Sequence, residues 1–455
     1  MQIDESLSSA RASLATALIT ALRAQGHQGY LVGGCVRDRL LGITPKDFDV
    51  ATDARPDDVL RYFPQSRLVG AQFGVVLVSE GQGIQVEVAT FRSEGSYSDG
   101  RRPDVVRFES QPALDARRRD FTINGLLQDP LSGEVLDYVG GKADLEAKIV
   151  RAIGDPDQRF EEDHLRMLRA IRFAARLGFS IERETFSAIQ RAAPRIAKIS
   201  PERIREELIR ILTEGAAHRG FELLDSSGLL EKIAPEIKAC QGVAQPPEYH
   251  PEGDVWTHMM LMLERMRDPE PALALGVLFH DVGKPATFRV AERIRFDGHA
   301  EVGAVIAKDW LYRLRFSNDE VEQVTSLVAN HMRFKDVRQM RLGTLKRFLS
   351  LPHFEQHLEL HRLDCLSSHG HLENYDFVQA KLSELGQDDL RPALLITGRD
   401  LISAGYTPSE AFGEALKAVE TGQLEGEIQT REQALAVARG ILDSNPLMIQ
   451  AQQNK

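Results

Sequence analysis

The sequence has few cysteines and no pair of them that suggests a metal site. Cys35, Cys240 and Cys365 are the only cysteines among 455 residues, and they stand far apart. Wide spacing in a long chain favours free thiols over a disulfide framework and excludes a small disulfide-stabilised fold. We therefore expect a reduced protein in a cytoplasmic setting.

Long apolar runs and an excess of positive charge are also missing. The apolar stretch at residues 12–22 is too short to span a membrane and follows two acids, so it predicts an amphipathic helix, neither a signal peptide nor an anchor. The formal net charge of −11 argues against a protein that coats nucleic acid without specificity. Two local patches differ: residues 101–120 hold six arginines against four acids, and residues 159–176 hold five against three. Such patches suit a limited contact with nucleotide or RNA.

The chain is too long for one hydrophobic core, and its patterns change along its length. Helices are expected at residues 8–25 and 56–62, and strands at 30–32 and 48–51. Alternating residues at 73–79 and 84–91 predict a hairpin. Residues 92–112 show little periodicity and indicate a loop, whereas nearly everything after residue 155 is helical in pattern. We expect an α+β domain followed by all-α regions, with boundaries at 1–150, 151–240, 254–370 and 371–455.

A glycine turn and two nearby aspartates form the most informative motif. Gly33-Gly34 is followed by Arg37, and then by Asp47-Phe48-Asp49. Alternate residues of a strand share a face, so the two aspartates should converge. Convergent carboxylates suit Mg²⁺ bound to substrate phosphates, and Glu87, in an antiparallel hairpin beside this strand, could supply a third ligand. This is the chemistry of nucleotidyl transfer. Solvated loop acids and a surface Glu87 are the plain alternatives.

Two arginine-rich segments follow. Arg118-Arg119 can contact phosphate, and Asn124 offers an amide to a sugar or base. In a predicted helix over residues 162–176, Asp163 and Arg166 stand three apart, can form an ion pair, and face away from an apolar stripe. A rigid carboxylate and guanidinium could read the Watson–Crick edge of C or A. A solvated helix face with an ordinary ion pair is the alternative.

Over residues 28–215 these motifs, in this order, resemble the class II tRNA nucleotidyltransferases, or CCA-adding enzymes, of the polymerase-β-like superfamily. The resemblance implies head, neck, body and tail regions, a cytoplasmic enzyme that extends tRNA with CTP and ATP, and no membrane or obligate protein partner. It implies Mg²⁺ on Asp47 and Asp49 with Glu87 as the third carboxylate. It assigns nucleotide binding to Gly33, Gly34, Arg37, Arg119, Asp163, Arg166, Arg169 and Arg172.

Members of this family differ in what they add: CCA, CC only, A only, or poly(A). Residues 93–107 resemble the flexible loop that CC-adding members lack. Residues 68–74 lack the arginine-rich form that we associate with bacterial poly(A) polymerases. Full CCA addition is therefore the leading expectation, and A-only addition stays open.

A second set of chemistry-bearing residues lies in the third region. Histidines and carboxylates spread over helices can converge on a divalent transition metal. The set resembles the HD phosphohydrolase superfamily, and its extra histidines resemble the two-metal members. An HD fold that only binds RNA is the alternative, as is a chain whose main activity is HD hydrolysis behind a nucleotide- or RNA-binding front half. The predicted ligands are His258, His280, Asp281, His299, His331 and Asp364, with His361 and His369 as competitors for the last place.

Overall fold

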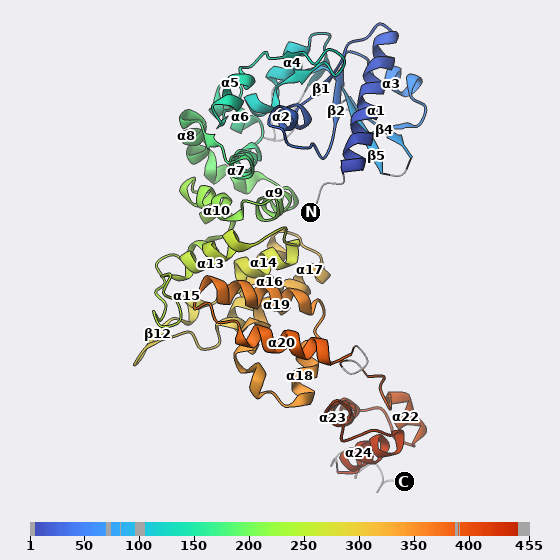
Figure 1. The fold of residues 1–455 in the computed structure, drawn as a ribbon, viewed down its shortest axis with the longest axis vertical. Coiled ribbons are helices and arrows are strands. Elements are labelled where there is room, and N and C mark those ends of the chain that lie inside the picture. Colours follow the sequence, from blue (N-terminus) through green and yellow to red (C-terminus); the bar gives the residue numbers. More distant parts are fainter. Residues whose placement is uncertain are drawn as a thin grey trace. The chain divides into compact units, whose positions relative to one another are not determined.

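The computed structural model describes residues 5–69, 74–81, 83–95, 105–386, 390 and 392–444. The chain divides into two compact units, shown in Figure 1. The front unit comprises Met1–Gln241, Leu263–Ala274 and Asp309–Ser317, and the rear unit comprises Gly242–Met262, Leu275–Lys308 and Asn318–Lys455. An α+β head followed by helices confirms the predicted fold class. Among the described helices, none is long and apolar enough to cross a membrane.

A seven-stranded sheet forms the head, in the order β3-β4-β5-β2-β1-β8-β9. The predicted hairpin is present as the antiparallel pair β4–β5, but β5 runs parallel to β2, with Glu87 opposite Asp49. The amphipathic helix α1 (Glu5–Ala24) buries Leu18, Ile19 and Leu22 and packs against β1 and β5. The strands are β1 (Gly29–Val32), β2 (Asp49–Thr52), β3 (Ser66–Leu68), β4 (Val75–Glu80), β5 (Ile84–Thr90), β8 (Leu127–Gln128) and β9 (Val135–Leu136).

The segment that we interpreted as a loop contains a short strand pair. β6 (Arg92–Glu94) pairs antiparallel with β7 (Val106–Phe108). Strands of three residues are too short to show a period of two, so the sequence gives no signal for them. The middle of this segment lies outside the described residues, as do residues 70–73 of the stretch used to argue against poly(A) addition.

The helix predicted over residues 162–176 begins only at Arg166. α6 (Pro156–Glu162) ends before Asp163, which is extended (φ −146°, ψ 105°), and α7 (Arg166–Leu177) begins three residues later. The Asp163 carboxylate accepts the Leu165 backbone N–H at 3.1 Å, and this local bond competes with helix continuation. Other front-unit elements are α2 (Gly34–Leu40), α3 (Pro56–Tyr62), α4 (Pro112–Arg117), α5 (Gly141–Glu146), α8 (Arg183–Ala192), α9 (Pro201–Thr213) and α10 (Ala217–Ser226).

The helices that carry the HD motif meet closely at one point. A Cβ on Gly283 would lie 2.1 Å from the carbonyl oxygen of His299, so only glycine allows this approach. A hairpin that the sequence analysis missed, β12 (Arg289–Val290) with β13 (Ile294–Arg295), lies between them in sequence. The helices are α13 (Val255–Arg265), α14 (Pro271–Phe279), α15 (Lys284–Thr287), α16 (His299–Arg313), α17 (Asn318–Asn330), η4 (His331–Gln339), α18 (Leu342–Leu349), α19 (Phe354–Ser367) and α20 (Glu373–Glu384).

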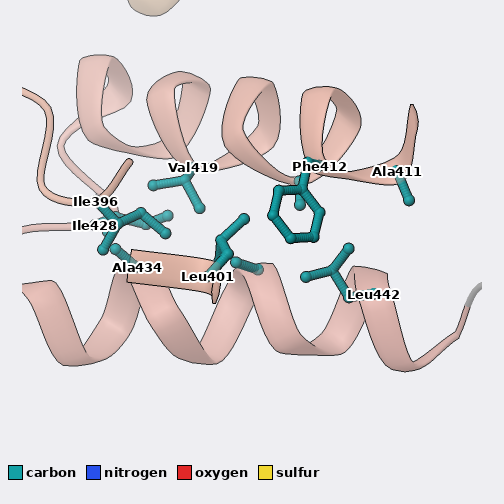
Figure 2. Packing of buried hydrophobic residues seen from close by; sticks show 10 residues of the cluster. Ile396, Leu401, Ala411, Phe412, Val419, Ile428, Ala434 and Leu442 are labelled. Atoms are coloured by element: carbon teal, nitrogen blue, oxygen red, sulfur yellow. The ribbon is translucent and has the colours of Figure 1, made fainter. Parts of the chain in front are cut away.

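The last helices of the rear unit pack around a hydrophobic cluster of their own (Figure 2). α22 (Gly398–Ser403), α23 (Glu410–Glu425) and α24 (Arg431–Asp443) contribute Leu401, Phe412, Val419 and Leu442 to it. A capping box between Thr430 and Gln433 begins α24.

Candidate active sites

The glycine turn at the end of β1 brings an arginine close to the backbone. Gly33 has a φ of 77°, and a Cβ there would lie 3.2 Å from Nη1 of Arg119. Glycine therefore serves both the left-handed conformation and the close approach of the guanidinium. The turn leads directly into α2 at Gly34.

Carboxylates gather where β2 begins. Burial and the facing Glu87 raise the pKa of Asp49 to about 6, and Asp47 adds to this effect. A bound cation would relieve this crowding of negative charge, so the donor set fits a hard divalent metal. β2 starts at Asp49, so Asp47 lies just before the strand, and the buried Phe48 and Val50 alternate with the two aspartates. The Asp47 side chain is 80% exposed and forms an ion pair with Arg11 at 3.0 Å.

A polar cavity of about 510 Å³ opens beside Asp49. Its positive lining contrasts with the acidic chain as a whole, since eight arginines face four carboxylates there. It suits a polyanionic ligand. The lining comprises Gly33, Gly34, Arg37, Asp49, Arg92, Glu94, Arg118, Arg119, Asp120, Asn124, Asp163, Arg166, Arg169, Arg172, Phe173 and Arg210.

Neighbouring carboxylates hold in place the two arginines that we expect to contact phosphate. Arg37 is buried and forms an ion pair with Asp38 at 2.6 Å. Arg119 forms an ion pair with the buried Asp115 at 3.0 Å. A guanidinium has five N–H donors, so an arginine anchored by a carboxylate keeps donors for a ligand and loses little side-chain entropy on binding it.

Asn124 lines the cavity, and its amide also makes two contacts within the protein that we did not predict. Its Oδ1 accepts from Arg37 at 2.6 Å, and its Nδ2 donates to Asp120 at 3.1 Å. Asp120 also accepts from Nε of Arg169 at 2.8 Å. Burial acts to raise its pKa, but Arg169 and Asn124 lower that pKa to about 2. Asp120 is a site residue that we missed, although it follows Arg119 directly in the sequence.

The predicted ion pair between Asp163 and Arg166 gives way to two other pairs. Both carboxylate oxygens of Asp163 accept from Arg203 of α9, at 3.2 and 2.8 Å. Arg166 forms an ion pair with Glu162 and donates to the Arg159 carbonyl at 3.0 Å. The extended backbone at Asp163 removes the i, i+3 relation on which the prediction rested. Both side chains still line the same cavity.

Arg172 is buried, and its replacement should destabilise the front unit. Nε of Arg172 lies 2.6 Å from Glu207, with side-chain exposures of 4% and 6%, and the guanidinium stacks over Phe173 at 4.3 Å. Arg172→Ala leaves a buried carboxylate poorly paired, so the free energy of unfolding should fall by about 3 kcal/mol.

Urea unfolding of the front unit measures this loss. The matched control is Arg191→Ala, since Arg191 and Asp157 form an exposed pair at 2.6 Å with side-chain exposures of 57% and 56%. That variant should lose less than about 1 kcal/mol. Equal midpoints for the two variants would show that the buried pair contributes nothing special.

The six predicted HD-type ligands converge in the rear unit. They fall into two groups, His258, His280 and Asp364, and Asp281, His299 and His331. Within each group the candidate ligand atoms all lie within 4.8 Å of one another. Nitrogen and carboxylate donors of this kind fit a divalent transition metal.

Backbone carbonyls orient three of these histidines. A carbonyl only accepts, so the Nδ1 atom that faces it must carry the proton, and Nε2 is left with a free lone pair. The Nε2 atoms of His299 and His331 lie 3.2 Å apart. At this distance their lone pairs repel each other, and a cation bound to both would relieve the repulsion. The accepting carbonyls belong to Val277, Phe296 and Val328, at 2.9, 2.8 and 2.6 Å from His280, His299 and His331.

Glu252 orients His258 and was missed by the sequence analysis. Its carboxylate accepts from Nδ1 of His258 at 2.7 Å and from His250 at 2.8 Å. Nε2 of His258 lies 3.2 Å from Asp364. Burial opposes protonation, but Asp364 and Glu252 raise the pKa of His258 to about 9. The acid of His250-Pro251-Glu252, just before the first ligand, was the available signal.

The competitors of Asp364 have other contacts. His361 stacks on Phe334 with ring centroids 4.3 Å apart. Nδ1 of His369 accepts the backbone N–H of His371 at 3.0 Å. Neither joins a ligand group in the described part of the chain, so the geometry favours Asp364.

Asp281 faces both ligand groups. Its Oδ2 lies 3.1 Å from Nε2 of His280, and its Oδ1 lies 3.5 Å from Nε2 of His299. Buried Lys284 contacts Oδ2 at 2.6 Å and donates to Gln245. Burial acts to raise the pKa of Asp281, but His280 and Lys284 hold it well below its usual range. The Asp281 carboxylate is thus charged, and the two ligand groups share it.

The three cysteines, all within the described residues, are buried and form no disulfide. Burial raises the pKa of the Cys35 thiol to about 11. Burial and the adjacent Asp364 raise that of Cys365 to about 12. These two thiols are therefore protonated near neutral pH and are poor metal ligands and nucleophiles.

Three protein families match successive parts of the chain. Residues 29–151 match the Poly A polymerase head domain. Residues 178–241 match the probable RNA and SrmB-binding site of polymerase A, and residues 253–361 match the HD domain.

Curated relatives match the chain over different lengths. The CCA-adding enzyme of Enterococcus faecalis is 34% identical over 427 residues, covering 92% of this chain and 94% of that protein. The CCA-adding enzyme of Bacillus pumilus is 43% identical over 216 residues, covering 48% of this chain, so the chain spans only 54% of that relative. Poly(A) polymerase I of Haemophilus influenzae is 40% identical over 234 residues, or 49% of this chain and 51% of that protein.

A solved structure matches nearly the whole chain. The CCA-adding enzyme of Bacillus stearothermophilus, solved in complex with CTP, is 26% identical with a TM-score of 0.70, and 97% of this chain and 98% of that one are covered. With the near-full-length Enterococcus faecalis relative, this confirms the resemblance derived from the motifs. The chain belongs to the family of CCA-adding enzymes.

Proposed function

We propose that this protein adds C, C and A to the 3′ ends of tRNA from CTP and ATP, with release of pyrophosphate. The observation that carries the proposal is the arginine-lined cavity that joins Asp49 to Asp163 and Arg166. It offers carboxylates for metal, cations for a triphosphate, and a separate carboxylate and guanidinium for a base. We place the reaction in the cytoplasm, and we expect neither a membrane nor an obligate protein partner to take part.

The residues around the glycine turn hold the triphosphate in this proposal. Asp47, Asp49 and Glu87 offer hard oxygen ligands, and Mg²⁺ held there supplies charge neutralisation at the phosphates and activation of the 3′-hydroxyl. Arg37 and Arg119 donate to phosphate oxygens beside Gly33 and Gly34. Because their carboxylate partners already fix both guanidinium groups, the cavity is organised before substrate arrives.

Asp163 and Arg166 select the base. C and A both present an amino donor next to a ring-nitrogen acceptor, whereas U and G present a carbonyl acceptor next to an N–H donor. A carboxylate that accepts from the amino group beside a guanidinium that donates to the ring nitrogen therefore favours C and A. Arg169 and Arg172, held by Asp120 and Glu207, support this pair from the cavity wall.

Arg203 should control how well Asp163 discriminates between bases. Its two contacts with both oxygens fix the plane of the carboxylate. In Arg203→Gln the carboxylate can rotate, so the ratio of kcat/KM for CTP over UTP should fall about tenfold, the equivalent of about 1.4 kcal/mol.

The matched control is Arg205→Gln on the same helix, where Arg205 donates to the Arg315 carbonyl away from the cavity. This variant should keep the ratio unchanged. If Arg203→Gln lowers kcat/KM equally for CTP and UTP, Arg203 has a structural role only and the discrimination argument is wrong.

Incorporation assays test the proposed reaction. Labelled CTP and ATP, singly and together with Mg²⁺, are offered to tRNAs that end before CCA and after CC. Addition of C, C and then A is the expected result. Incorporation of ATP on the CC-ended tRNA alone would make this an A-adding enzyme, and long adenosine tails would indicate poly(A) addition. No incorporation on either tRNA would overturn the proposal and leave the rear unit as the main activity.

We also propose a metal-dependent phosphohydrolase in the rear unit, because the Nε2 lone pairs and carboxylates of two ligand groups converge there. Divalent transition metal bound to His258, His280, Asp364, Asp281, His299 and His331 supplies Lewis-acid activation of water and of phosphoryl oxygens. Asp281 faces both groups and is the residue best placed to serve two ions. Release of phosphate from p-nitrophenyl phosphate, with Mn²⁺, Ni²⁺ or Zn²⁺ added one at a time, tests this activity.

A further inference from the structure

Three exposed cations line the cavity at the HD-type centre in addition to residues of the two ligand groups. About 500 Å³ in volume, it is lined by Asp281, His299, His331 and Asp364 and also by exposed Arg293, Arg295 and Lys335. In the described structure these three cations form no ion pair. Their charge is therefore available to an anionic ligand.

Two of the cations come from the hairpin β12–β13, which extends away from the helices of the rear unit (Figure 1). Arg293 lies in its turn and Arg295 on β13. Asp297, the cavity acid nearest to the hairpin in sequence, already forms an ion pair with Arg289 at 2.6 Å. The hairpin thus presents net positive charge to the cavity, and Lys335 adds to it from η4.

An exposed aromatic ring lines the same cavity. Tyr249 is 53% exposed, and it stands just before the helix that carries His258. Aromatic rings beside a row of cations bind single-stranded nucleic acid, because bases stack on the ring while phosphates contact the cations. Inorganic phosphate or a small phosphate ester has neither a base to stack on the ring nor a second phosphate to contact the cations.

We propose that this cavity takes the phosphate-bearing end of a single-stranded RNA. The terminal phosphate lies at the histidine–aspartate centre, the preceding phosphodiester lies on Arg293, Arg295 and Lys335, and a base stacks on Tyr249. This inference rests on the proposed phosphohydrolase activity and names its substrate class. In the reaction, the oxygen of water bonds to phosphorus and the bond from phosphorus to the ribose oxygen breaks. The ribose oxygen takes up the proton that water releases, which gives hydroxyl-ended RNA and inorganic phosphate.

Steady-state hydrolysis by the full chain tests the inference. The substrates are p-nitrophenyl phosphate, adenosine 3′,5′-bisphosphate and a short single-stranded oligoribonucleotide with a 3′-phosphate. In R293A/R295A, kcat/KM for the oligonucleotide should fall about tenfold. The slope of log(kcat/KM) against log salt concentration should become less steep by about 1.4, since each of the two lost phosphate contacts accounts for about 0.7. Hydrolysis of p-nitrophenyl phosphate should not change. The control R293K/R295K keeps the charge and should retain most of the oligonucleotide activity.

Each other result overturns the inference in a distinguishable way. Equal losses on oligonucleotide and p-nitrophenyl phosphate would mean that the hairpin supports the fold of the centre only. Unchanged oligonucleotide kinetics would mean that the cations contact no substrate. If the bisphosphate is used as well as the oligonucleotide and responds equally, the ligand is a small nucleotide with two phosphates. If the native chain hydrolyses none of the three with any metal, the phosphohydrolase proposal itself fails.

Discussion

Replacing Asp49 with asparagine is expected to lower incorporation of both CTP and ATP by at least about 10³-fold, since a lost metal ligand removes several kcal/mol of charge stabilisation. Asp49 lines the arginine-lined cavity and lies directly opposite Glu87 in the sheet. Asparagine has nearly the same shape, so β2 should form as before. Burial and repulsion from Glu87 together raise the pKa of Asp49 to about 6, and the neutral amide relieves both effects, so folding should not suffer.

Single-turnover incorporation on a tRNA that lacks CCA measures the effect. Asp58→Asn is a suitable control, because Asp58 pairs with Arg61 at 2.5 Å on α3 and does not line the cavity. Hydrolysis by the rear unit should be unchanged in both variants, which shows that the chain is folded. Near-native incorporation by Asp49→Asn would remove this carboxylate from the catalytic set.

The second large effect is expected from Asp281→Asn, which should abolish phosphohydrolase activity and reduce the metal content of the protein. The carboxylate faces His280 with one oxygen and His299 with the other, so its charge serves both ligand groups. Loss of a shared ligand should lower hydrolysis by at least about 10³-fold. Metal analysis of the purified chain gives a readout that does not depend on activity.

Asp281→Asn also leaves the buried Lys284 without its carboxylate, so a second variant is needed. His331→Gln leaves the pair of Asp281 and Lys284 in place, because it removes only an imidazole that faces Asp281 at 3.8 Å and the Val328 carbonyl. It should lose metal and hydrolysis in the same way. Nucleotide incorporation should persist in both variants, because the head belongs to the other compact unit. Metal retained at the native level in both would contradict the assignment of this centre.

The sequence was most informative where a pattern is local. The glycine turn at Gly33, the hairpin β4–β5 and the pair His280-Asp281 each depend on neighbours in the chain, and the structure contains all three features. The fold class followed because alternation and helical periodicity change sharply near residue 155. Order of motifs along the chain then identified the family.

Contacts between distant residues were not predictable in the same way. Several arginines stand near Asp163 in the sequence and could pair with it. Only tertiary packing brings it to Arg203, forty residues away. At the break between α6 and α7, the bond from the Leu165 backbone N–H to Asp163 competes with helix continuation, and helical periodicity gives no signal of it. Parallel pairing of β2 with β5 depends on the path of the chain between them. Glu252 acts through His258 and carries no periodic signal of its own.

The buried thiols make the chain a convenient subject for fluorescence. Cys35, Cys240 and Cys365 are all shielded from solvent, and the high pKa values of Cys35 and Cys365 keep these two in the slow-reacting form. Cysteines introduced at exposed positions, such as Val290 on β12 and Arg191 on α8, should therefore react with maleimide dyes much faster than the native ones. Energy transfer between the two dyes would then report, without removal of any native cysteine, whether the distance between the two units changes when tRNA, CTP and ATP are added.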